Sequence, residues 1–182
     1  MELIIASQNQ NKLVEFKKIL GDKINLFSLS DIGLNQEIPE NEKTIKKNAM
    51  FKAKFVNTQT GKNVFADDTG LEIDSLNGEP GVYSARYSGV ERNSDKNIEL
   101  VLTKLKNKSN RNSRFKTIIS LILDGKSVNF EGVVEGKITE EKRGNNGFGY
   151  DPIFQPNGYA STFGEMSLKA VSYTHLRAHE TR

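Results

Sequence analysis

The stretch LIIASQNQNK at residues 3–12 places a short apolar run directly before a polar loop. Leu13, Phe16 and Leu20 follow at helical spacing, and Gly21 stands where a helix of this length would end. The order predicts a buried strand, a loop and a helix at the start of the chain. A second strand over 24–29 and a helix over 44–57 continue this alternation, which is typical of an α/β domain.

The remaining segments indicate further strands and hairpins. Residues 64–66 and 71–76 have the pattern of two strands, and the segment between them, Asp-Asp-Thr-Gly at 67–70, has the composition of a turn. After a predicted helix over 97–106, the apolar segments 115–123 and 128–138 surround Asp124-Gly125, which is a strong hairpin signal. Alternating strands and helices followed by hairpins predict a mixed sheet flanked by helices.

The composition excludes several kinds of chemistry. The 182 residues suit one domain, and the absence of cysteine excludes thiolate nucleophiles, disulfides and cysteine-ligated zinc. Both histidines, His175 and His179, lie in the last eight residues, so the rest of the chain cannot supply a Ser-His-Asp triad. Proton chemistry must therefore come from carboxylates, lysines, tyrosines or metal-bound water.

The charge pattern and hydropathy narrow the class of protein further. The formal net charge is +3, with basic residues interleaved among acidic ones, so we expect no nucleic-acid partner. No apolar run is long enough to cross a bilayer, and the first residues lack the pattern of a signal peptide. The sequence thus predicts a cytoplasmic protein without a membrane partner.

The loop between the first strand and the first helix is a candidate phosphate site. Unpaired N–H groups at the start of a helix attract anions, and small polar side chains add donors. The alternative is an ordinary helix cap formed by Asn9 or Asn11, with Lys12 in solvent. The candidate residues are Ser7, Gln8, Asn9, Gln10, Asn11 and Lys12.

Adjacent acids at Asp67 and Asp68 are a candidate magnesium site. Neighbouring carboxylates repel one another unless a cation offsets their charge, and Mg²⁺ prefers oxygen ligands. The alternative is a turn. Glu40, which precedes the second helix, either adds a further carboxylate to this site or interacts with the helix dipole. Lys52 lies on the polar face of that helix, where it either joins the site or extends into solvent.

The glycine-rich segment GFGYDP at 147–152 carries two aromatic side chains. An aromatic ring between glycines can stay accessible, and such a ring can stack on a nucleobase. The alternative is a tight loop whose aromatic rings belong to the core.

The order of these motifs resembles a known family, the pyrophosphatases of non-standard purine nucleoside triphosphates, also called inosine triphosphate pyrophosphatases or the HAM1/RdgB-like family. The resemblance spans about residues 3–168. The matching segments, in chain order, are SQNQNK (7–12), Glu40 with TIKKNAMFKA (44–53), ADDTGL (66–71), PGVYSARY (80–87), GFGYDPIF (147–154) and FGEMS (163–167).

The resemblance implies a fold, a reaction and a set of site residues. The fold is an elongated, twisted mixed sheet flanked by helices, with two lobes around a central cleft. The reaction is magnesium-dependent hydrolysis of ITP, dITP or XTP to the monophosphate and pyrophosphate, which removes damaged nucleotides from the pool, and the protein is a homodimer. The implied roles are Asp68 as catalytic residue, Glu40 and Asp68 as metal ligands, and substrate contacts by residues 7–12, Lys52, Thr69, Phe148, Gly149, Tyr150 and Asp151.

The end of the chain departs from the family pattern. The family continues into a Ser-His-Arg triplet that recognises the purine, and this triplet is absent, since Lys169, His175 and Arg177 fall at other spacings. We therefore expect one domain over 1–168 and an atypical tail, foreign to the domain, over 169–182. Two alternatives follow: a Maf-like nucleotide pyrophosphatase with another base preference, or an inactive nucleotide-binding protein that lacks base recognition.

Overall fold

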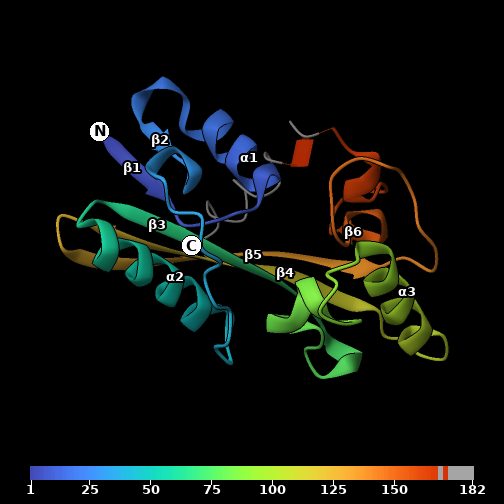
Figure 1. Cartoon of the computed structure of the whole chain (residues 1–182). Coiled ribbons are helices and arrows are strands. Elements are labelled where there is room, and N and C mark those ends of the chain that lie inside the picture. The colour runs from blue at the N-terminus through green and yellow to red at the C-terminus, as the bar shows by residue number, and fades with distance from the viewer. Residues whose placement is uncertain (168–169, 172–182) are drawn as a thin grey trace. The chain divides into compact units, whose positions relative to one another are not determined.

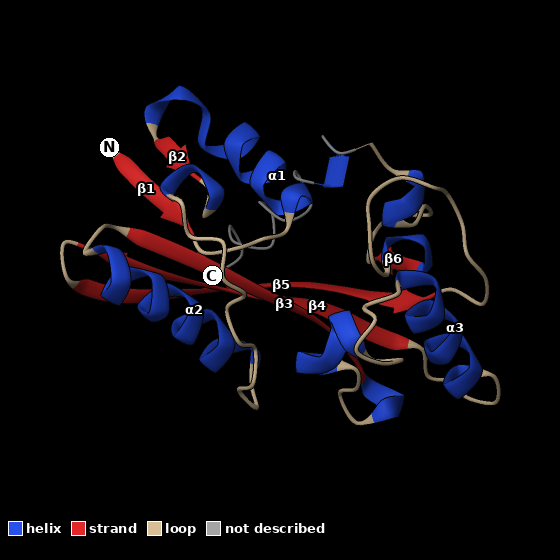
Figure 2. Ribbon diagram, viewed as in Figure 1, coloured by secondary structure: helices blue, strands red, loops and turns tan. Residues whose placement is uncertain are grey.

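The computed structural model describes residues 1–167 and 170–171. Its helices and strands form a mixed α/β arrangement, with six strands in one sheet ordered β2-β1-β3-β4-β5-β6 (Figures 1 and 2). The strands are β1 (Glu2–Ile5), β2 (Asn25–Phe27), β3 (Val64–Ile73), β4 (Asn112–Leu123), β5 (Lys126–Ile138) and β6 (Phe154–Pro156). The helices are α1 (Gln10–Leu20), α2 (Ile45–Thr60) and α3 (Ser94–Leu105).

The sheet combines parallel and antiparallel pairs. β1 runs parallel to both β2 and β3, whereas β5 and β6 are antiparallel. Asp124 and Gly125 join β4 to β5 with φ angles of 48° and 76°, as a two-residue hairpin of this kind requires. The predicted mixed sheet with flanking helices is confirmed.

The chain divides into two compact units. Unit 1 comprises residues 1–68 and 118–131, and unit 2 comprises 69–117 and the described part of 132–182. Each unit has a hydrophobic core of its own. The long strands β3, β4 and β5 contribute residues to both units.

In unit 1, alternate side chains of β1 enter cores on opposite faces of the sheet. Leu3 and Ile5 pack on one face, with Phe65 of β3 and with Leu13 and Phe16 of α1. On the other face, β1 and β3 residues pack with Ala53 and Val56 of α2. The two helices therefore cover opposite faces of the sheet (Figure 1).

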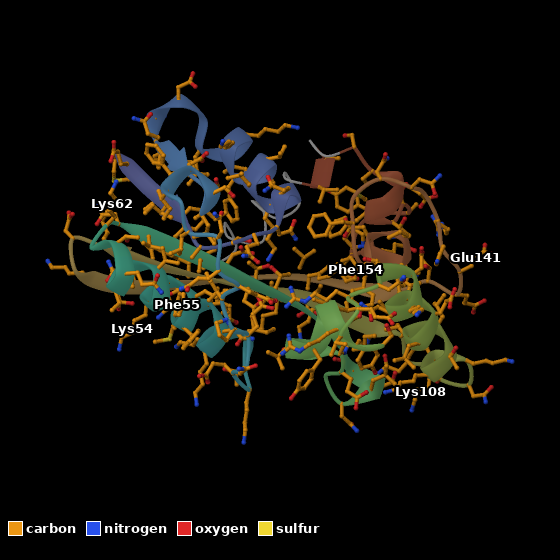
Figure 3. The ribbon with its side chains drawn as sticks, viewed as in Figure 1. Lys54, Phe55, Lys62, Lys108, Glu141 and Phe154 are labelled. Carbon is orange, nitrogen blue, oxygen red and sulfur yellow. The ribbon has the colours of Figure 1, made fainter. Side chains whose placement is uncertain are left out.

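In unit 2, the core gathers around three aromatic rings. Phe154 of β6, labelled in Figure 3, lies with its ring centroid 4.6 Å from that of Phe115 and 5.1 Å from that of Phe163. Ile98 and Val101 of α3 belong to the same core. These contacts fix α3 and the segment around β6 within unit 2.

The structure corrects one prediction about β3. The two strands expected over 64–66 and 71–76, with a turn at 67–70, are one strand from Val64 to Ile73 that continues through the acids. A turn follows at Asn77 and Gly78, whose φ angles are 55° and 85°, as the Asn-Gly pair in the sequence indicates. Within the described residues, no helix is long and apolar enough to cross a membrane.

Candidate functional site

The acids of β3 lie just beyond the end of a neighbouring strand. β1 pairs with β3 up to Ile5 and Phe65, and the Ala6 N–H donates to the Phe65 carbonyl oxygen at 2.8 Å. Asp67 and Asp68 follow on β3, past the carboxyl end of β1. Ligands of open α/β sheets gather at the carboxyl ends of strands, so this position favours a binding site although the acids themselves are in mid-strand.

Because successive side chains of a strand point to opposite faces of the sheet, the carboxylates of Asp67 and Asp68 lie on opposite faces. Asp67 has the parity of Phe65, whose side chain packs with α1, and Asp68 has the parity of Ala66, which packs with α2. Each acid accordingly meets a lysine from the helix on its own side. Two residues adjacent in sequence thus enter two different ion pairs.

The first ion pair joins α1 to β3. The Lys12 ammonium lies 2.5 Å from Asp67 Oδ2, and the exposed fractions of the two side chains are 16% and 3%. Burial lowers the pKa of Lys12, but the charge and hydrogen bond of Asp67, with the charges of Asp68 and Glu40, outweigh burial and leave this pKa above its ordinary value. Lys12 therefore keeps its positive charge in a largely buried place.

The second cluster joins α2, β3 and the loop before α2. The ammonium of Lys52, which is buried, lies 3.0 Å from Glu40 Oε1 and 3.5 Å from Asp68 Oδ1. Burial raises the pKa of Asp68 above its ordinary value, and the positive charges of Lys52 and Lys12 offset only part of that effect. Asp68 is thus a carboxylate with an enhanced tendency to accept a proton.

The loop that carries Glu40 is fixed by the start of α2. Thr44 is the N-cap of that helix and accepts a hydrogen bond from the Lys47 N–H at 3.2 Å. The buried side chain of Asn48 accepts from the Glu42 N–H at 3.0 Å. These bonds hold the incoming chain against the helix, and Glu40 reaches Lys52 from there.

The charged side chains of the candidate site carry an excess of negative charge. Three carboxylates, Glu40, Asp67 and Asp68, face two ammonium groups, Lys12 and Lys52. The described residues contain no group of three or more acidic or histidine side chains arranged to hold a metal ion on their own. A cation at Glu40 and Asp68 would therefore complete its ligand shell with oxygens that this cluster does not supply.

The loop before α1 combines capping with an open pocket. Asn9 Oδ1 accepts from the Lys12 N–H at 3.4 Å, and Ser7 Oγ accepts from the Asn9 N–H at 3.2 Å, so Asn9 is the helix cap that the alternative interpretation predicted. The same alternative placed Lys12 in solvent, and that part is wrong.

Gln8 donates to the Gln36 carbonyl oxygen at 3.2 Å. A pocket of about 250 Å³ beside the loop is lined by Ser7, Gln8, Gln10, Ser28, Leu29, Ser30, Leu34 and Asn35.

Unit 2 holds the glycine-rich loop. The Phe148 side chain is 43% exposed, and its N–H donates to Asp151 Oδ2 at 2.8 Å. A Cβ at Gly147 would overlap the Asp151 carboxylate, and the φ of Gly147 is +76°, so this close turn requires glycine. Asp151 therefore folds the loop over itself and leaves the Phe148 ring accessible.

Tyr150, next to this loop, belongs to the core of unit 2. Its side chain is buried, its hydroxyl donates to the Ser84 carbonyl oxygen at 2.9 Å, and burial raises its pKa far above the ordinary value. Thr69, at the start of unit 2, shares a hydroxyl–hydroxyl bond of 3.0 Å with Thr117. Tyr150 thus supports the loop from inside, while Phe148 and Gly149 are on its outer part.

A family model described as the Ham1 family matches residues 3–179 of the chain. The chain belongs to the Ham1 family. It is similar to the dITP/XTP pyrophosphatase of Flavobacterium psychrophilum, with 48% identity over 182 residues that cover 100% of this chain and 96% of the relative. The dITP/XTP pyrophosphatase of Christiangramia forsetii is 53% identical over 172 residues, which cover 94% of this chain and 90% of that protein.

Solved structures agree with this membership of the Ham1 family. The Staphylococcus aureus Ham1 protein has a TM-score of 0.88 and 37% identity, covering 98% of this chain and 93% of that one. A Coxiella burnetii HAM1 protein has a TM-score of 0.89 and 35% identity, covering 99% and 95%. The family and the fold class predicted from the sequence are therefore confirmed.

The structure brings only some of the predicted site residues of this Ham1 chain together. Glu40, Lys52 and Asp68 form one cluster in unit 1, and the charge of Lys12 interacts with its two carboxylates. Thr69 and residues 148–151 belong to unit 2. The ion pair of Asp67 with Lys12 was missed, although the two-residue period of a strand signals that neighbouring acids diverge. The Asn11 side chain and the positions Lys169, His175 and Arg177 lie outside the described part of the structure. The expected homodimer, cytoplasmic location and foreign tail stay predictions.

Proposed function

We propose that this Ham1-family chain hydrolyses 6-oxo purine nucleoside triphosphates such as ITP, dITP and XTP to the monophosphate and pyrophosphate. The observation that carries the proposal is the cluster of Lys12, Lys52, Glu40 and Asp68 beside the loop before α1. It combines buried cations with a carboxylate that readily accepts a proton. The relatives named dITP/XTP pyrophosphatases support the choice of substrate.

The two lysines and the loop are proposed to bind the triphosphate. Lys12 is at the start of α1, where N–H groups and the helix dipole attract anions. Ser7, on the loop, and Gln10, the first residue of α1, line the pocket of about 250 Å³. A polyanion bound here would contact the two ammonium groups, and the cation proposed at Glu40 and Asp68 would offset the negative charge that the three carboxylates leave in excess.

Glu40 and Asp68 are the proposed magnesium ligands. Their oxygens approach one ammonium group at 3.0 and 3.5 Å, so the two carboxylates already converge, and carboxylate oxygen is the ligand type that Mg²⁺ prefers. The ion would complete its shell with phosphate and water oxygens and offset the charge that develops during phosphoryl transfer.

Asp68 is the proposed general base. Burial raises its pKa, which favours proton uptake, and a bound Mg²⁺ would reverse part of this change. It would orient a water molecule toward the α-phosphorus and accept its proton as the new P–O bond forms. The bond from the α-phosphorus to the bridging oxygen then breaks, and pyrophosphate leaves.

Phe148 is proposed to stack on the purine. Phe148→Ala is expected to raise the KM for XTP about tenfold, since stacking of a base on an aromatic ring contributes ~1–3 kcal/mol. The same change should leave the affinity for inorganic tripolyphosphate, which has no base, as it is. Phe130→Ala is the matched control, because Phe130 is 50% exposed against 43% for Phe148. Equal losses for XTP and tripolyphosphate would remove Phe148 from base binding.

Removing divalent metal tests the part assigned to Glu40 and Asp68. With excess EDTA, turnover of XTP is expected to fall by more than about a hundredfold, because charge on the transferred phosphoryl group is then left without its counter-ion. Adding Mg²⁺ back should restore it, and the circular dichroism spectrum should stay unchanged throughout. Full turnover in EDTA would contradict the metal assignment.

A substrate panel tests the proposed function as a whole. Pyrophosphate release with Mg²⁺ is measured for ITP, XTP, dTTP and UTP, and the expected result is turnover of the two purine nucleotides well above the two pyrimidine ones. The opposite preference would favour a Maf-like pyrophosphatase. Release from none of the four would indicate a nucleotide-binding protein without activity, and a second chain with a family-like ending then tests whether the atypical tail is the cause.

A further inference from the structure

Asp67 is a buried carboxylate whose role the proposed mechanism leaves open. Asp67 is only 2% exposed, and its Oδ2 is the atom that forms the ion pair with the Lys12 ammonium. The other oxygen, Oδ1, is also buried and has no hydrogen-bond partner in the part of the chain that the structure describes. A carboxylate buried in this way is costly unless it is paired, so Lys12 is the contact that keeps Asp67 in place.

The position of Asp67 separates it from the proposed metal ligands. Asp68 and Glu40 share the ammonium of Lys52, on the face of the sheet covered by α2. Asp67 has the opposite parity on β3 and lies on the face covered by α1. It therefore forms its direct ion pair with a different lysine from Asp68, although the two residues are adjacent.

Lys12 needs such a partner if it is to bind phosphate efficiently. A lysine side chain has four flexible methylene groups, and fixing it costs conformational entropy when the ligand binds. An ammonium group has three N–H donors, and one of them serves Asp67. The remaining donors belong to a side chain that keeps 16% of its surface accessible.

We propose that Asp67 is a positioning residue, which holds the Lys12 ammonium in place before the triphosphate arrives. The proposal rests on the phosphate-binding role given to Lys12 under the proposed function. Asp67 contributes to affinity only through Lys12, so it should strengthen binding of the triphosphate and leave turnover of bound substrate nearly unchanged. The proposal gives it no contact with the base or with the attacking water.

A double-mutant cycle between Asp67 and Lys12 tests this inference. The variants Asp67→Asn, Lys12→Met and the double variant are compared for binding of inorganic tripolyphosphate with Mg²⁺ by calorimetry, and for KM and kcat with XTP. Each single change is expected to weaken tripolyphosphate binding about tenfold, the scale of a lost hydrogen bond to a charged group. The double variant should bind no more weakly than Lys12→Met alone.

The Tm of the same variants, measured by thermal unfolding, provides a second test of the coupling between Asp67 and Lys12. Each single variant leaves one buried charge without its partner and should lower Tm, whereas the double variant removes both charges and should regain most of the loss. Recovered stability without recovered affinity would separate positioning from a merely structural role. Asp95→Asn, which removes an exposed partner of Lys142, is the control and should change neither quantity.

Some outcomes would overturn the inference. Losses that multiply to about a hundredfold in the double variant would mean that Asp67 and Lys12 act independently. Unchanged affinity for tripolyphosphate in Asp67→Asn would also overturn the inference. A fall in kcat with KM unchanged would overturn it as well. Failure of the proposed function looks different: the wild type would turn over neither ITP nor XTP, while coupling between the two residues would still appear in tripolyphosphate binding and in Tm.

Discussion

Asp68→Asn is expected to lower kcat for XTP by more than about a hundredfold, the scale of losing a positioned general base. The amide keeps the shape of the carboxylate, but it cannot accept the proton of the attacking water. Because Lys52 keeps Glu40 as a partner at 3.0 Å, the fold should stay intact. Steady-state release of pyrophosphate measures the loss, and circular dichroism checks the fold.

The control for this variant is another aspartate of unit 1. Asp22 is exposed, in the short turn after α1, and Asp22→Asn should leave kcat as it is. Near-normal turnover in Asp68→Asn would remove Asp68 from the role of base. A large loss in both variants would point instead to a general effect of lost negative charge.

Lys52→Met is expected to lower the free energy of unfolding by about 3 kcal/mol, because removing one partner of a buried ion pair leaves uncompensated charge behind. Lys52 is 6% exposed, and its loss would leave the carboxylates of Glu40 and Asp68 facing each other without a cation. Urea unfolding followed by circular dichroism measures the change. Added Mg²⁺ should recover part of the stability, since it would take the place of the ammonium between the two carboxylates.

A second lysine on α2 provides the comparison. Lys54 is exposed and labelled in Figure 3, and Lys54→Met should alter the free energy of unfolding by less than about 0.5 kcal/mol. A similarly small change in Lys52→Met would mean that the cluster of Lys52, Glu40 and Asp68 does not hold unit 1 together. Stability lost without any recovery by Mg²⁺ would count against Glu40 and Asp68 as metal ligands.

Local patterns predicted much of the fold correctly. The apolar spacing of Leu13, Phe16 and Leu20 identified α1, and Asp124-Gly125 identified the hairpin between β4 and β5. Such features depend on neighbours within a few residues, so the sequence displays them directly. The strand through Asp67 and Asp68 was misjudged, because turn-forming residues there are overridden by a sheet that extends past the end of β1.

The pairings within the candidate site could not be predicted in the same way. Lys12 and Asp67 are distant in sequence, and only packing of α1 on one face of the sheet brings them together. Tyr150 and the Ser84 carbonyl are separated by 66 residues, so the local sequence could not decide between a buried and an exposed ring. The opposite directions of Asp67 and Asp68 were readable in principle, once the segment was recognised as one strand.

Hydrolysis of XTP in water labelled with ¹⁸O tests the central claim most directly. If Asp68 directs water to the α-phosphorus, as proposed, one labelled oxygen appears in the nucleoside monophosphate and none in the pyrophosphate that is released. Mass spectrometry of the two products reads this in a single reaction. Label in the pyrophosphate, or release of labelled orthophosphate, would place the attack on another phosphorus and contradict the account.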